Sequence, residues 1–108
     1  MKYFVGMDLH SSNTVLSIID EKGNRVYKAK VANFLPLILN ELELFRRGIV
    51  GVVVESTFNW YWLVDGLMEA GYKLHLANPS AIKQYEGLKH TADYHDAFHL
   101  ANLLRLGI

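Results

Sequence analysis

Four of the eleven acidic residues stand where an ordinary surface charge is not expected. Asp8 ends an otherwise apolar segment, and a charge there is costly unless it is paired or coordinates an ion. Glu55 directly follows a run of three valines. Asp93 and Asp96 are three residues apart, so they share one face of the helix that the apolar residues after them predict.

These four carboxylates suggest a metal site for phosphodiester chemistry. Carboxylates gathered in one place repel one another and raise each other's pKa unless cations intervene. Oxygen ligands are the set that Mg²⁺ and Mn²⁺ prefer. Two such ions about 3.5–4 Å apart can activate a nucleophile and stabilise the leaving oxygen. We therefore predict Asp8, Glu55, Asp93 and Asp96 as catalytic ligands of two Mg²⁺ or Mn²⁺ ions. The alternative for Asp93 and Asp96 is favourable capping of a helix N-terminus.

The first third of the chain predicts three consecutive strands. Alternating and β-branched residues indicate strands over 2–9, 14–19 and 25–32. The residues of 20–24 favour a turn in which Gly23 takes a positive φ. Short polar connections between such strands are typical of an antiparallel meander.

Helices and strands alternate in the rest of the chain. We expect a helix after Asn33 as N-cap, ending near Gly48, and then a buried strand over 49–54. A helix over 60–70, a strand over 72–77, a helix starting at Asn78-Pro79 and a last helix over 93–108 follow.

This β-β-β-α-β-α-β-α order predicts an α/β fold, a mixed sheet with helices on both faces. Ribonuclease H-like nucleases begin in this way, and so do ATPases of the actin and sugar-kinase fold. The first strand and the first crossover strand should be neighbours, which brings Asp8 to Glu55 at the carboxyl edge of the sheet. The last helix can then lay Asp93 and Asp96 over them.

Composition narrows the class of protein. A chain of 108 residues is about one domain. Eleven basic and eleven acidic side chains cancel, which argues against strong nucleic-acid binding by this chain alone. The absence of cysteine excludes a disulfide scaffold and a thiolate zinc site. No segment is long enough for a membrane span or a signal sequence, so we expect a cytoplasmic protein.

Several motifs together resemble the N-terminal domain of DEDD-type insertion-sequence transposases, the Piv/MooV-like DNA recombinases. They are VGMDLH (5–10), VVEST (53–57), ANP (77–79) with Lys83, and TADYHDA (91–97) followed by Leu100-Ala101. The resemblance implies a RuvC-like, ribonuclease H-like fold, and the four acids match the family's tetrad one by one. Two departures exist: Ala92 separates Thr91 from the aspartate at 93, which puts a role for a preceding lysine in doubt, and Phe58 replaces a common glycine.

The resemblance also implies an activity and partners. Family members recombine DNA with Mg²⁺, and their nucleophilic serine lies in a second, C-terminal domain. We therefore expect residues 1–108 to be the N-terminal catalytic domain of a longer prokaryotic transposase, not competent alone for the full reaction. Expected partners are the DNA of element ends and target, further copies of the chain in a homo-oligomer and, as in several family members, a guide RNA.

Other interpretations remain open at this stage. The chain can be a non-catalytic module with the same fold that binds nucleic acid or another subunit. An actin- or sugar-kinase-like ATP-binding lobe shares Gly6 and Asp8, but its glycine-rich phosphate turn is missing from 10–13. His95 and His99 imitate a zinc-protease helix without its glutamate. The aromatic residues of 58–62 favour core packing over base stacking.

Overall fold

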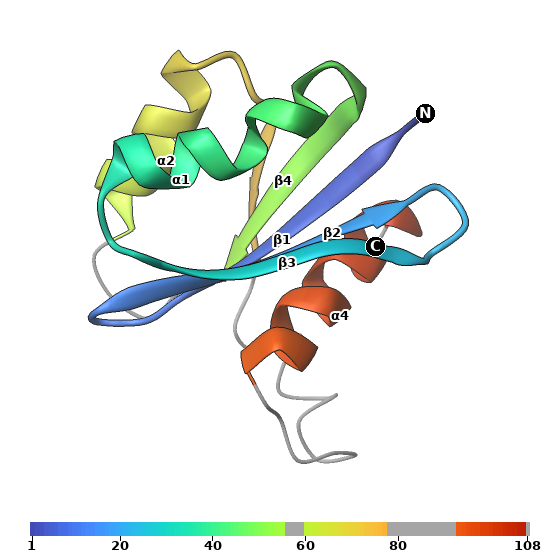
Figure 1. Cartoon of the computed structure of the whole chain (residues 1–108), viewed down its shortest axis with the longest axis horizontal. Helices are drawn as coiled ribbons and strands as arrows, with labels where there is room; N and C mark the ends of the chain where they lie inside the picture. Colours follow the sequence, from blue (N-terminus) through green and yellow to red (C-terminus); the bar gives the residue numbers. More distant parts are fainter. Residues whose placement is uncertain (56–59, 78–92, 108) are drawn as a thin grey trace.

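The computed structural model describes residues 1–55, 60–77 and 93–107, except the side chains of 93–96 and 99. Nine elements lie in these ranges (Figure 1): β1 (Tyr3–Leu9), β2 (Asn13–Asp20), β3 (Arg25–Ala32), α1 (Leu35–Leu42), the 3₁₀ helix η1 (Glu43–Gly48), β4 (Ile49–Glu55), α2 (Tyr61–Glu69), β5 (Leu74–Leu76) and α4 (Asp93–Arg105).

The five strands form one mixed sheet in the order β3-β2-β1-β4-β5. β1, β2 and β3 pair antiparallel as a meander, whereas β4 pairs parallel with β1 and with β5. Strand β1 is therefore central, with β3 and β5 as edges. The α/β class, the mixed sheet and the order of elements are confirmed.

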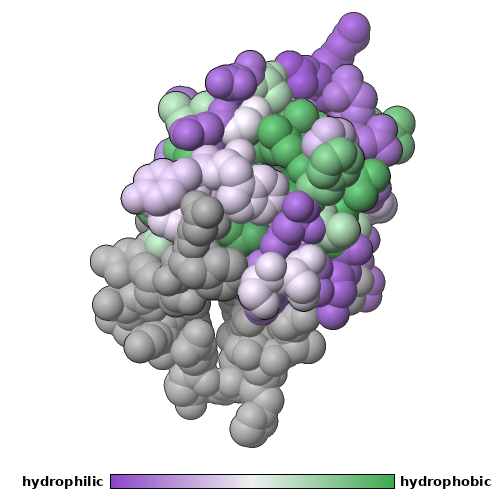
Figure 2. Space-filling model, turned by 90° about the vertical axis from the view of Figure 1, so that its left-hand side faces the viewer, coloured by the Kyte–Doolittle hydropathy of each residue, from purple (hydrophilic) through white to green (hydrophobic). Residues whose placement is uncertain are grey.

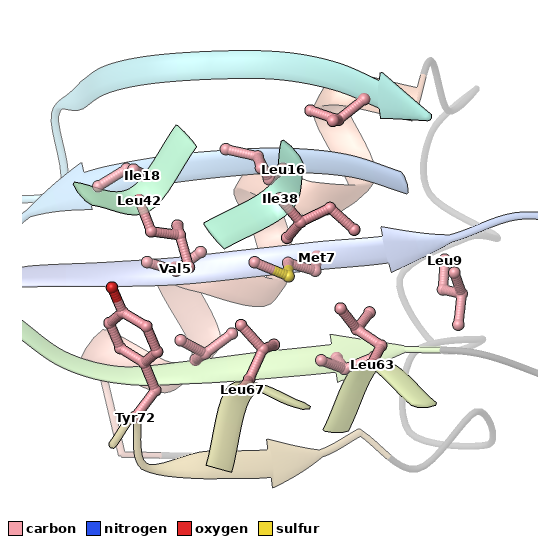
Figure 3. Close-up of a cluster of buried hydrophobic side chains, with 13 residues drawn as sticks. Val5, Met7, Leu9, Leu16, Ile18, Ile38, Leu42, Leu63, Leu67 and Tyr72 are labelled. Carbon is pink, nitrogen blue, oxygen red and sulfur yellow. The ribbon is translucent and has the colours of Figure 1, made fainter. Parts of the chain in front are cut away.

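One face of the sheet packs against α1 and α2. Side chains from β1, β2 and β4 alternate toward these helices and form the main core (Figure 3). Its fully buried members include Val5, Met7, Leu16, Ile18, Val52, Val54, Ile38, Leu42, Leu63 and Leu67. The outer sides of α1 and α2 keep exposed apolar residues, among them Phe34, Leu37 and Met68. Figure 2 views the molecule from the left-hand side of Figure 1, and apolar residues lie beside hydrophilic ones in the upper part of this view.

The opposite face of the sheet is covered by α4 (Figure 1). Among the side chains of α4 that the structure describes, Ala97, Leu100 and Ala101 are buried, and Leu103 and Leu104 are half-buried. The helix backbone rests on Gly6 of β1, because a methyl group there would overlap the carbonyl oxygen of Ala97 and lie 2.6 Å from the Ala101 nitrogen. Helices therefore cover both faces, as expected.

Most sequence expectations hold, with three differences. The helix expected to end near Gly48 is α-helical only over Leu35–Leu42 and continues as the 3₁₀ helix Glu43–Gly48. Gly23 has φ 89° in the β2–β3 turn, and Pro36 lies in the first turn of α1. However, the N-cap of α1 is Phe34, and Asn33 bonds elsewhere, so the Asn33 cap was wrong. The strand expected over 72–77 is only Leu74–Leu76. The helix expected at Asn78-Pro79 lies outside the described residues. Within the described residues, no helix is long and apolar enough to cross a membrane.

The close approach of α4 to Gly6 predicts a large effect of Gly6→Ala. The added methyl group meets helix backbone that cannot rotate away, so α4 must move and the free energy of unfolding should fall by at least about 1–3 kcal/mol. Gly51→Ala is the matched control on the same face, since its nearest neighbour, Leu104 Cδ2, lies at an ordinary 3.5 Å. Urea unfolding of both variants measures this, and equal stabilities would contradict the packing.

The β2–β3 turn predicts a pH dependence of stability. The backbone N–H groups of Asn24 and Lys22 both donate to Asp20 Oδ1 at 2.9 Å, and the bond from Asn24 is the largest cause lowering the pKa of Asp20. A carboxyl with a lowered folded pKa stabilises above its unfolded pKa of about 3.9 and loses this as the pH falls through the folded pKa.

We therefore expect Asp20→Asn to weaken the loss of stability below about pH 4. Urea unfolding between neutral and acid pH measures it. A variant with the pH profile of the wild type would show that this carboxylate does not stabilise the turn.

Candidate functional site

Two of the four predicted ligands lie side by side at the carboxyl ends of adjacent parallel strands. Asp8 is the second-last residue of β1, and Glu55 is the last residue of β4. The two residues are Cα partners in the parallel register. Register partners point to the same face of a sheet, here the α4 face, because Val5, Met7 and Leu9 fill the opposite core. The predicted meeting of Asp8 and Glu55 is thus confirmed at the level of the backbone.

The two carboxylates differ in their surroundings. Asp8 is 4 % exposed, and its strand β1 lies between β2 and β4 in the sheet. Glu55, at the end of β4, is only half-buried. Like charges on neighbouring strands destabilise a sheet. A buried carboxylate also needs a partner that compensates for the water it has lost.

His10 lies next to Asp8. The Nε2 atom of His10 lies 3.2 Å from Asp8 Oδ2, and the imidazole is 40 % exposed while the carboxylate is almost covered. The two residues are two positions apart, so a chain leaving β1 in extended form carries both to the same face. His10 had no role in the sequence analysis, although the Asp-x-His spacing at a strand end was a usable signal.

The loop that carries His10 is tied to the sheet by Asn33. The Asn33 amide donates to the carbonyl of His10 at 2.7 Å and accepts a bond of 2.7 Å from the buried hydroxyl of Thr14. The His10 backbone N–H also donates to Asn13 at 2.8 Å. Asn33 therefore positions the loop beside Asp8 instead of capping α1.

The remaining predicted ligands lie in the first turn of α4. Ala97 sits over Gly6, and the Arg105 side chain lies near Gly23 in the β2–β3 turn at the far end of the sheet, so α4 runs antiparallel to β1 (Figure 1). Four residues of helix and two of strand each span about 6 Å. Because Gly6 faces the helix between Ala97 and Ala101, the first turn of α4 is roughly level with Asp8.

The side chains of Asp93 and Asp96 lie outside the described residues, as do those of His95 and His99. Within the described part of the chain, no three His, Asp or Glu side chains gather as a metal-binding group. What the described residues offer is a pair of carboxylates on one face, facing the start of a helix. This oxygen donor set fits a hard divalent cation, which would also relieve the repulsion between Asp8 and Glu55.

The aromatic residues near α2 mostly support the core, as expected. Trp60 and Trp62 are half-buried and pack against the main cluster. Tyr61 is 62 % exposed, with its ring stacked on Trp60 at 4.2 Å between centroids. Phe58 lies outside the described residues.

Two solved structures share this architecture. RuvC from T. thermophilus, solved in complex with a Holliday junction substrate, is similar over 99 % of this chain and 97 % of its own, with TM-score 0.74 and 16 % identity. The large terminase nuclease of thermophilic phage G20c matches 98 % of this chain with TM-score 0.58 and 17 % identity, and the match spans 55 % of that protein. At these identities the likeness shows the fold, which is RuvC-like and ribonuclease H-like.

The family of the chain is shown by its sequence. No curated protein sequence matches the chain. Residues 5–107, however, match the family of IS110-type DEDD transposases. This range contains the four predicted acids, the helices on both faces of the sheet and all the strands except the first two residues of β1. The chain belongs to the IS110-type DEDD transposase family.

Proposed function

We propose that this chain is the metal-dependent catalytic domain of a DNA transposase that acts on phosphodiesters of a mobile element. The observation that carries the proposal is the in-register pair of Asp8 and Glu55 on the α4 face, inside a chain of the transposase family. Its substrate would be the DNA of element ends and target.

In this proposal Asp8, Glu55, Asp93 and Asp96 hold Mg²⁺ or Mn²⁺. Bound there, the ions would polarise the phosphodiester and lower the pKa of the attacking group. Asp8, on the rigid central strand, provides a fixed ligand, while Glu55 at the strand end can adjust to the ion. The Nε2 atom of His10 lies 3.2 Å from the Asp8 carboxylate, at the same edge of the sheet.

The wider features of the proposal rest on the family resemblance alone. They are that residues 1–108 are the RuvC-like domain of a longer transposase, that a second domain supplies a nucleophilic serine, and that the full-length protein assembles as a homo-oligomer and is joined by a guide RNA. A non-catalytic module that binds nucleic acid or another subunit is the alternative, and the two experiments below separate it from the enzyme.

Metal binding predicts a thermal shift that depends on Asp8. At about ten times the dissociation constant, Mg²⁺ or Mn²⁺ should stabilise the fold by about 1.4 kcal/mol, which raises Tm by roughly 6–10 °C. Asp8→Asn should lose the shift, and Asp65→Asn, which changes an exposed carboxylate of α2, should retain it. Equal shifts in the wild type and Asp8→Asn would refute the metal site.

DNA cleavage tests the function itself. In the full-length transposase, Asp8→Asn, Glu55→Gln and Asp96→Ala should each abolish Mg²⁺-dependent cleavage of element-end DNA, because each removes a metal ligand. Binding of the same DNA and the Tm of the metal-free protein should remain near those of the wild type. Cleavage at the wild-type rate by these variants would leave the non-catalytic module as the better interpretation.

A further inference from the structure

Three basic residues of edge strand β3 lie on the face that carries the candidate site. Tyr27, Ala29 and Val31 alternate into the core beneath α1, so Lys28 and Lys30 point to the α4 face. Both lysines are exposed. Arg25 belongs to the same face, since its guanidinium lies over the ring of Phe98 on α4, 5.4 Å from the centroid.

The strand register aligns Lys30 with the two carboxylates. Lys30 is the Cα partner of Val15, Val15 of Asp8, and Asp8 of Glu55. One row across the sheet therefore reads Lys30–Val15–Asp8–Glu55. Lys28 is two residues earlier on β3, where its Cα partner is Ser17. At about 4.8 Å per strand, the backbones of Lys30 and Asp8 are roughly 10 Å apart.

This arrangement addresses an electrostatic problem of the site. Carboxylates repel the phosphates of a nucleic acid, and affinity for phosphate comes from lysine and arginine. Three other described basic groups lie elsewhere: Lys22 is in the β2–β3 turn at the far end of the sheet, Arg46 packs on Tyr72, and Arg105 bonds Asn102. Lys28 and Lys30 lie on the site's own face.

We infer that Lys30 and Lys28 bind backbone phosphates of the DNA strand whose scissile phosphate lies at Asp8 and Glu55. Phosphates rise by about 3.4 Å per nucleotide along one strand, so a span of roughly 10 Å places the Lys30 contact within about three nucleotides of the reacting bond. The two lysines are positioning residues that set the path of the strand. This inference rests on the proposed function, since it takes DNA as the ligand.

A purely structural role for these lysines is the competing explanation. Lysine on an exposed edge strand prevents sheets from pairing between molecules. That role requires charge on β3 but no contact with phosphate. Removal of the charge would then cause aggregation without any change in DNA binding, so the two explanations predict different results.

The salt dependence of DNA binding provides the test. The probe is a DNA duplex of arbitrary sequence, and its affinity for the protein is measured between about 50 and 200 mM salt by fluorescence anisotropy. Each phosphate contact contributes about 0.9 to the slope of log K against log salt. Lys30→Gln and Lys28→Gln should each reduce the slope by about 0.9, and the double variant by about 1.8.

Lys22→Gln is the matched control, because it removes the same charge from an exposed site at the far end of the sheet. It should keep the wild-type slope. Equal slopes in all variants, equal reductions in all of them, or no binding by the wild type at the lowest salt would overturn the inference. Lysine dependence with an RNA duplex but not with DNA would also overturn it, and analytical ultracentrifugation detects the aggregation expected of a purely structural role.

The metal-induced rise in Tm separates this inference from the proposed function. Lys30→Gln should retain the full shift with Mg²⁺, because the lysine is not a metal ligand. A retained shift with an unchanged salt slope refutes the phosphate contacts alone. A reduced salt slope in a protein that shows no metal shift supports the phosphate contacts and refutes the metal site.

Discussion

The contact between the backbone of α4 and Gly6 is the constraint on which the site depends. Because no side chain separates them, helix and strand approach closely at this point. The contact sets the level of α4 along β1 and brings the start of the helix to the height of Asp8. A larger residue at position 6 would lift the helix and separate its first turn from the carboxyl edge of the sheet.

The electrostatics of the α4 face follow from the strand register. A shift of one residue would turn Asp8 into the apolar core and Leu9 out of it. The alternation of Val5, Met7 and Leu9 in the core therefore holds the carboxylate on the other face. The net charge of the chain is zero. One row of the sheet nevertheless holds Lys30 on β3 and the acids Asp8 and Glu55 on β1 and β4, so opposite charges are separated within this face.

Local patterns predicted most of the fold because each depends on neighbouring residues. The valines before Glu55 indicated a buried parallel strand, and Gly23 indicated the turn whose positive φ it adopts. Asn33 was misassigned as a cap because its side-chain partners, Thr14 and His10, are 19 and 23 residues away. Only the folded meander brings those groups within reach.

The sequence by itself determined the types of residue, the order of the elements and the family, and so predicted the pairing of Asp8 with Glu55. Tertiary structure decided that His10 lies beside Asp8 and which lysines share its face. Register and packing between distant segments settle such contacts, and these depend on how side chains fill a common core rather than on the preferences of any one segment.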